Sequence, residues 1–203
     1  MIYCSNLSFC FIAVPKTGTT SIEQFLAEYC ASKDAPYIKT NKSDTQLHNV
    51  EGKHASISAV KATYSTENII TAGFVRNPWD KVVSWFNYLK LNKRSVHTID
   101  QNVSFADFLY SAPDFVFTQS YHHLTNLNGD VDVDFIGRFE EFDLYFNLMC
   151  ELFNIKEGHL KKMNSSHNSV HYSRFYTPDT AKFIKDRFVG DIELFNYAFE
   201  EKQ

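Results

Sequence analysis

The sequence predicts an α/β fold in which a short parallel sheet is flanked by helices. Two apolar runs, residues 9–14 and 68–75, are rich in β-forming residues and too short for helices, so they indicate buried strands. Each run leads within a few residues into a segment whose apolar side chains recur at three- and four-residue spacing, which is the pattern of a helix packed on a sheet. Strands that alternate with helices are typical of a parallel α/β sheet.

The remaining elements fit the same fold. Residues 36–39 form a short candidate strand, and residues 57–64 predict a short helix with Ser56 as its N-cap. A turn signal at residues 177–179 starts a C-terminal helix. No linker rich in glycine, proline or serine divides the chain, so we expect a single domain over residues 1–203. The other expected elements are helices over residues 105–110 and 143–153 and a strand over residues 131–137.

The composition is that of a soluble globular protein. The chain has 203 residues, enough for one sizeable core, and hydrophobic and charged residues make up 44% and 22% of it. A formal net charge of -4 argues against a nucleic-acid partner. Four cysteines stand without CxxC spacing, which favours free thiols in a reducing compartment. No run approaches the roughly 18 apolar residues of a membrane span, and no basic region precedes the first strand, so we expect a cytoplasmic protein.

The turn between the first predicted strand and its helix has the chemistry of a phosphate-binding loop. It reads PKTGTTS over residues 15–21. In such a turn, backbone N–H groups converge on an anion at a helix N-terminus, where the helix dipole favours negative charge. Lys16 adds a cation, and the loop's later hydroxyl residues add further donors. The simpler alternative is a structural turn in which Thr20 and Glu23 form a capping box.

The loop differs from that of ordinary nucleotide triphosphatases. Their motif places a lysine directly after the second of two glycines and follows it with a hydroxyl residue that holds magnesium. In this chain Lys16 precedes Gly18, which is the only glycine of the loop, and no glycine stands at the loop's start. The order of residues therefore indicates a phosphate-binding loop of another kind.

A second candidate phosphate site follows the strand over residues 68–75. Arg76 stands at the carboxyl end of this strand, and Ser84 lies eight residues further along the next helix, for which Asn77 and Pro78 suit the cap and first position. Ligands of open α/β sheets bind outside the carboxyl ends of the strands. A guanidinium and a hydroxyl are both good phosphate donors, so Arg76 and Ser84 could close on one phosphate. The alternative is an arginine paired with a surface carboxylate and a serine tolerated on a helix.

In this order, the PKTGTTS loop and the later R-x-P…S arrangement resemble the two phosphate sites of sulfotransferases that use 3′-phosphoadenosine 5′-phosphosulfate (PAPS). The resemblance covers nearly the whole chain and implies a single P-loop-type domain. It also implies that a sulfuryl group passes from PAPS to an acceptor hydroxyl, leaving adenosine 3′,5′-bisphosphate, without a metal ion. It assigns the 3′-phosphate to Arg76 and Ser84, and it makes Lys16 a catalytic residue that stabilises the leaving phosphate. The 5′-phosphosulfate is assigned to Lys16, Thr17, Gly18, Thr19, Thr20 and Ser21.

The resemblance is closest to the branch that contains membrane-bound carbohydrate sulfotransferases and their soluble bacterial relatives. In its 2-O-sulfating members a histidine just before the R-x-P strand is the catalytic base, and His54, twenty-two residues ahead of Arg76, occupies the matching place. An imidazole with a pKa near neutrality can accept the proton of an attacking hydroxyl. Other branches use a glutamate near the first helix, which makes Glu23 and Glu28 the alternatives. On position alone, a histidine beside a helix start is more often structural.

A polar stretch over residues 161–176 matches the family's loop that closes over the nucleotide. Within it, His167 and His171 have the spacing of a metal-binding pair, but no third ligand is evident, so we expect no metal site. The candidate nucleotide contacts of this stretch are Lys161, Lys162, Asn164, Ser165, Ser166 and Arg174.

Two other functions stay open at this point. A P-loop kinase or nucleotide hydrolase would need magnesium, for which Asp134 is a candidate ligand, although its place inside a predicted strand argues against that role. A non-catalytic module of the same fold would bind the nucleotide without turnover. For a sulfotransferase, we expect the acceptor to be a carbohydrate, a small glycoside or a metabolite. Trp85, Tyr88 and Tyr121 could stack on such an acceptor, or they belong to the core.

Overall fold

The computed structural model describes residues 1–40, 52–91, 99–156 and 170–201. The chain forms two compact units, the first made of Met1–Arg76 with Ser120–Asn164 and the second of Asn77–Gln119 with Ser165–Gln203. The expected α/β class is confirmed, whereas the expectation of a single domain over residues 1–203 stays a prediction. None of the helices in the described part of the chain has the length and apolar character that crossing a membrane requires.

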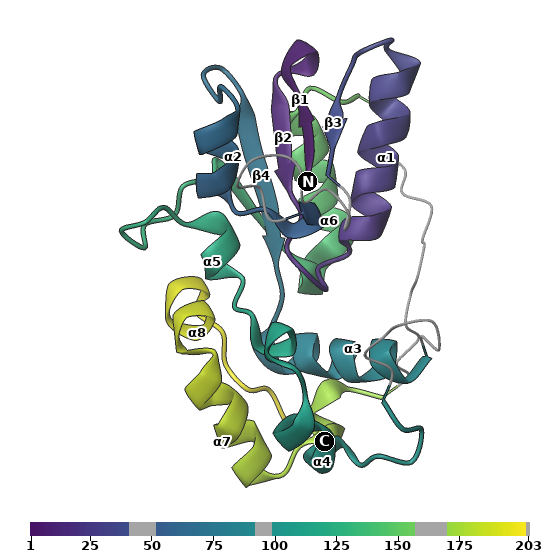
Figure 1. The fold of residues 1–203 in the computed structure, drawn as a ribbon, viewed down its shortest axis with the longest axis vertical. Helices are drawn as coiled ribbons and strands as arrows, with labels where there is room; N and C mark the ends of the chain where they lie inside the picture. The colour runs from purple at the N-terminus through teal and green to yellow at the C-terminus, as the bar shows by residue number, and fades with distance from the viewer. Residues whose placement is uncertain (41–51, 92–98, 157–169, 202–203) are drawn as a thin grey trace. The chain divides into compact units, whose positions relative to one another are not determined.

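The first unit is built on a five-stranded sheet in the order β3-β1-β2-β4-β5 (Figure 1). The three strands β2, β4 and β5 are parallel, as the sequence predicts, while β1 pairs antiparallel with both β2 and β3. The antiparallel pair was not predicted, because β1 is only three residues long and a 3-10 turn joins it directly to β2. The strands are β1 (Ile2–Cys4), β2 (Phe9–Ile12), β3 (Ile38–Lys39), β4 (Ile70–Val75) and β5 (Phe135–Arg138).

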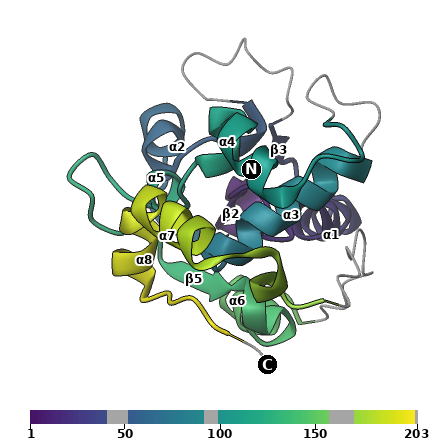
Figure 2. The same ribbon diagram turned by 90° about the horizontal axis from the view of Figure 1, so that it is seen from below.

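Helices pack on this sheet through the apolar side chains that the sequence pattern indicates. One continuous core joins Phe9 and Phe11 of β2 to Ile22 and Leu26 of α1 (Thr19–Ser32) and to buried residues of α6 (Phe142–Leu152). The short helices α2 (Ile57–Thr63) and α5 (Tyr121–Leu124) lie side by side in Figures 1 and 2. The predicted N-cap of α2 is confirmed, because the Ser56 hydroxyl accepts a hydrogen bond from the Ala59 N–H at 3.2 Å.

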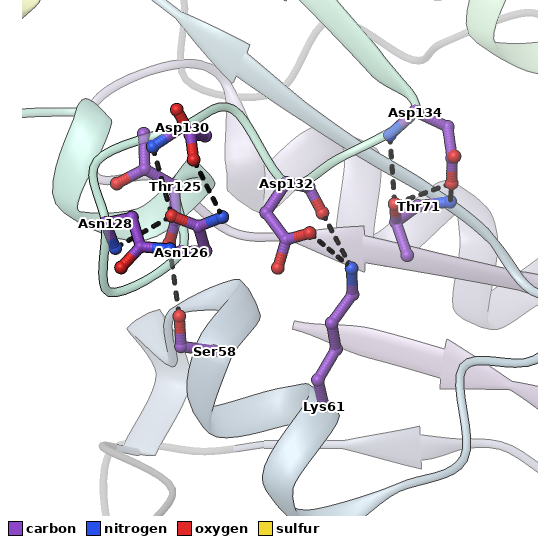
Figure 3. Close-up of polar contacts among 9 residues, drawn as sticks. All are labelled: Ser58, Lys61, Thr71, Thr125, Asn126, Asn128, Asp130, Asp132 and Asp134. Atoms are coloured by element: carbon purple, nitrogen blue, oxygen red, sulfur yellow. Dashed lines mark hydrogen bonds and ion pairs between the residues drawn. The ribbon is translucent and has the colours of Figure 1, made fainter.

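Asp134 fastens β5 to β4 at the amino ends of the two strands (Figure 3). Its carboxylate accepts hydrogen bonds from the backbone N–H and the hydroxyl of Thr71, both at 2.7 Å. Asp132 nearby accepts a hydrogen bond from Lys61 at 2.6 Å. The strand begins at Phe135 rather than at the expected residue 131, and Asp134 lies at the end of the sheet away from the phosphate-binding loop. These contacts give Asp134 a structural role.

The second unit is a helical cluster around aromatic side chains. Its helices are α3 (Pro78–Leu91), α4 (Phe105–Ser111), α7 (Pro178–Arg187) and α8 (Val189–Phe195). Trp79 and Phe86 of α3 lie in one core with Phe105 and Phe108 of α4. The Asn77 side chain accepts from the Trp79 N–H at 3.1 Å, which confirms it as the cap of α3. The predicted start of the C-terminal helix is also confirmed, because residues 177 and 180 form a capping box.

Candidate functional site

The phosphate-binding loop connects the end of β2 at Ile12 to the start of α1 at Thr19. Its backbone alternates in hand, because Lys16 has a φ of 66° and Gly18 a φ of 78°, while Thr17 between them does not have a positive φ. An alternation of this kind turns successive N–H groups toward one point and forms an anion-binding nest. The first turn of α1 adds the N–H groups of a helix N-terminus to the same region. This backbone conformation is compatible with the anion site that the sequence predicts, and the site itself stays a prediction.

Gly18 is required by two independent features of the loop. Its φ of 78° lies in the left-handed region, which costs other residues energy. A Cβ at this position would also stand 2.6 Å from a ring carbon of Phe142, the first residue of α6. The loop thus passes so close to α6 that only glycine fits.

Thr17 shapes the loop from within. Its hydroxyl donates to the carbonyl oxygen of Val14 at 2.9 Å, and its side chain is completely buried. In the structure, this hydroxyl therefore binds the backbone of its own loop. Its assignment to the 5′-phosphosulfate stays a prediction.

The predicted capping box between Thr20 and Glu23 does not form. The N-cap of α1 is Gly18, so Thr20 lies inside the first helical turn, where its side chain cannot cap. Glu23 is buried and instead forms an ion pair with Lys53 at 3.1 Å, while the α-amino group of Met1 donates to its other oxygen at 3.0 Å. The Glu23 carboxylate, which the local pattern predicts as a partner of the helix start, therefore binds Lys53 instead.

Lys16 stands in an environment that disfavours its own charge. Burial, with the nearby charges of Arg76 and Lys53 as smaller causes, lowers the pKa of Lys16 to about 7. An anion bound in the loop would oppose all three effects, because it pairs with the ammonium group and balances the neighbouring cations. The site therefore favours a ligand with negative charge.

Arg76 lies beside the loop at the carboxyl end of β4. Its Nη1 donates to the backbone carbonyl oxygen of Lys16 at 3.0 Å, and its guanidinium carbon lies 4.1 Å from the ring centre of Phe139. Ser84 belongs to α3 of the second unit and is buried there. The expectation that Arg76 and Ser84 hold one phosphate joins residues of two units and stays a prediction.

His54 ends a short 3-10 helix, Gly52–His54, and contacts the loop directly. Its Nδ1 lies 2.5 Å from the backbone carbonyl oxygen of Ala13. A carbonyl oxygen only accepts hydrogen bonds, so Nδ1 carries the proton and the lone pair of the neutral ring is on Nε2. Burial and, to a smaller extent, the charges of Lys53 and the α-amino group of Met1 lower the pKa of His54 to about 4, against the opposing effects of the Ala13 carbonyl and Glu23. At neutral pH the ring is therefore uncharged with its lone pair on Nε2, but a pKa of about 4 makes it a weaker base than the imidazole of near-neutral pKa expected from the sequence.

The two alternative bases are placed differently. The carboxylate of Glu23 is held in the ion pair with Lys53, and Glu28 lies further along α1, where it is exposed and accepts from Gln24 at 2.9 Å. His54, in contrast, contacts the residues between β2 and α1 directly through Ala13.

Two residues near the loop were missed by the sequence analysis. Lys53 contributes charge to the site and a contact of 3.5 Å to the Thr20 hydroxyl, and Phe139 forms the surface on which Arg76 lies. Sheet order could have indicated Phe139, because it follows β5 directly and the carboxyl ends of parallel strands meet at one edge. Among the candidates over residues 161–176, Arg174 lies in a 3-10 helix of the second unit, and the other five, like His167, lie outside the described residues.

Comparison with known proteins gives one strong match. A sequence model with the description "Sulfotransferase family" matches residues 1–198. Among solved structures, the fold is similar to that of a sulfotransferase from Alicyclobacillus acidocaldarius, with 13% identity over 95% of this chain and 96% of that one. The TM-score of 0.45 is too low for this likeness to support an assignment. No curated protein matches the chain.

Proposed function

The chain belongs to the sulfotransferase family, and on this premise we propose that it transfers a sulfuryl group from PAPS to a hydroxyl of a carbohydrate, small glycoside or similar metabolite. His54 is the proposed base and Lys16 the proposed cation at the leaving oxygen. The observation that carries the proposal is the contact between His54 and Ala13, because it fixes the base on the same loop that carries Lys16.

The proposed reaction is an in-line displacement at sulfur. The acceptor oxygen forms a bond to sulfur while the bond from sulfur to the 5′-phosphate oxygen breaks, and that oxygen keeps the electron pair. His54 accepts the acceptor's proton at Nε2. Lys16 offsets the charge that develops on the departing phosphate, and the loop N–H groups hold it in line.

Binding of the donor follows from the same loop. Thr19, Thr20 and Ser21 lie in the first turn of α1, so their N–H groups and hydroxyls are the proposed donors to the 5′ end. Arg76 and Ser84 are the proposed ligands of the 3′-phosphate. Magnesium has no part in this scheme, whereas a kinase would need it.

The first experiment is a thermal-shift comparison of adenosine 3′,5′-bisphosphate with AMP, with ADP and with ATP plus magnesium. A ligand at 100 times its dissociation constant stabilises the folded state by about 2.7 kcal/mol, which gives a clear shift in melting temperature. We expect selective stabilisation by the bisphosphate, lost in Arg76→Ala and kept in the control Lys61→Ala, whose ammonium group pairs with Asp132.

Other outcomes would redirect the assignment. Stabilisation by ATP with magnesium alone would favour a kinase or nucleotide hydrolase. Stabilisation by the bisphosphate without sulfuryl transfer to any hydroxyl acceptor would favour a non-catalytic binding module. Equal weakening of the bisphosphate and of adenosine 5′-phosphosulfate in Arg76→Ala would remove Arg76 from the 3′-phosphate site.

A further inference from the structure

A groove of about 580 Å³, lined by both polar and apolar side chains, lies along α1 beside the phosphate-binding loop. Thr20, Gln24, Ala27 and Ala31 of α1 line it at three- and four-residue spacing, so they share one face of the helix. The volume falls within the range of about 300–1,000 Å³ that is usual for small-molecule sites. The two alanines leave room in the groove that larger side chains would fill.

The groove begins beside the proposed transfer site, because Thr20 and Lys53 line it. Lys53 lines it, precedes His54 in the chain, and has its Nζ 3.5 Å from the Thr20 hydroxyl. Lys53 is also close enough to Lys16 to lower its pKa. Lys16 and His54 are not among the residues that line the groove, so a molecule seated in it would reach the proposed cation and base past Thr20 and Lys53.

The charges of the lining are balanced. Glu23, Glu28, Lys39 and Lys53 all line the groove, and Glu23 and Lys53 pair with each other at 3.1 Å. An anionic acceptor would call for a surplus of positive charge, and the groove does not supply one. The exposed carboxylate of Glu28 would instead repel it.

The remaining lining suits hydroxyl groups. The Glu28 carboxylate accepts one hydrogen bond from Gln24 at 2.9 Å and has capacity for more, while the Gln24 carbonyl adds a second acceptor. Tyr37 contributes a ring that is 37% exposed, which offers an apolar surface with a polar tip. Several hydrogen-bond acceptors beside one aromatic ring suit a sugar, because its hydroxyls can donate to the acceptors while its carbon ring packs on the aromatic surface.

We propose that this groove is the acceptor site and that it takes an uncharged, polyhydroxylated acceptor such as a neutral sugar or glycoside, with Glu28 and Tyr37 determining specificity. The inference rests on the proposed function for the reaction that follows, but binding in the groove can be measured without the donor. Glu28 is here a binding residue and leaves the proton transfer to His54.

Binding is tested first without any nucleotide. Saturation-transfer NMR with lactose and with methyl glucoside should show contact with the wild-type protein, and Tyr37→Ala should weaken it at least tenfold. The control Glu67→Gln, an exposed carboxylate outside the groove, should bind as the wild type does. Failure of the wild type to bind either sugar would overturn the proposed acceptor class even if the bisphosphate binds.

Turnover with labelled PAPS gives the second test. Glu28→Gln should raise KM for a neutral glycoside about tenfold with little change in kcat, and Glu28→Lys should shift the ratio of kcat/KM toward the matching glucuronide at least tenfold. Glu67→Gln should leave both constants unchanged. A large loss of kcat in Glu28→Gln would make Glu28 the base, and unchanged KM values in Glu28→Gln and Tyr37→Ala would remove the acceptor from the groove. If the bisphosphate fails to stabilise the protein, the donor assignment fails while the NMR result still decides the groove.

Discussion

Replacement of Gly18 by alanine tests whether the loop is as tightly fitted as its geometry indicates. The left-handed backbone at a φ of 78° costs an alanine about 1–2 kcal/mol. The new Cβ would stand 2.6 Å from Phe142, and overpacking of this kind costs about 1–3 kcal/mol more. The expected loss of about 2–5 kcal/mol is a large part of the 5–15 kcal/mol that usually stabilises a fold.

Gly129 is a matched control for the backbone cost alone. Its φ is 88°, and a Cβ there would meet no heavy atom within 4 Å. In urea denaturation, Gly18→Ala should therefore lose about 1–3 kcal/mol more of its free energy of unfolding than Gly129→Ala, and this difference is the cost of the contact with Phe142. Phe142→Leu should recover part of this difference in a double-mutant cycle. Equal destabilisation by the two glycine variants would refute the close approach of loop and helix.

Three further predictions concern charge and catalysis. The pKa of Lys16 is about 7 in the free protein, so the protein should take up a proton when it binds the bisphosphate above pH 7. Calorimetry in buffers of different ionisation enthalpy would measure this uptake. Lys16→Arg should abolish it, since a guanidinium stays charged. His54→Gln should lower kcat by about 10²–10⁴-fold without changing the shift in melting temperature that the bisphosphate causes. Because the pKa of His54 is lowered to about 4, the wild-type rate should fall on acidification near pH 4 rather than at about 6.5. Asp134→Ala should destabilise the fold by about 1 kcal/mol in urea titrations and leave bisphosphate affinity intact, whereas a magnesium ligand at this position would make the substitution abolish activity.

The parts of the fold that follow from local pattern were predictable from the sequence. The runs that became β2 and β4 combine β-forming residues with direct entry into a helix, and the caps Ser56 and Asn77 act on N–H groups two or three residues away. β1 was not predictable, because three residues carry no periodicity and its place depends on pairing with β2 and β3.

The sequence predicts candidate residues for the site but not their geometry. The spacing of Lys16, His54 and Arg76 identified the candidates, yet the tautomer of His54 depends on Ala13, a residue 41 positions earlier. The prediction of a capping box was wrong for a similar reason, because Glu23 pairs with the distant residue Lys53 and not with the start of its own helix. Tertiary contacts between distant residues decided both cases, and local sequence does not contain them.

The arrangement of the sheet explains why cationic groups gather at the loop. Lys16 follows β2, Arg76 follows β4 and Phe139 follows β5, and these three strands are parallel neighbours. Arg76 joins the ends, because it donates to the Lys16 carbonyl while lying on the Phe139 ring. Lys53 adds a further charge that disfavours protonation of Lys16. A bound anion would relieve this repulsion, so the affinity of the loop for an anion and the protonation of Lys16 must be coupled, and each should strengthen the other.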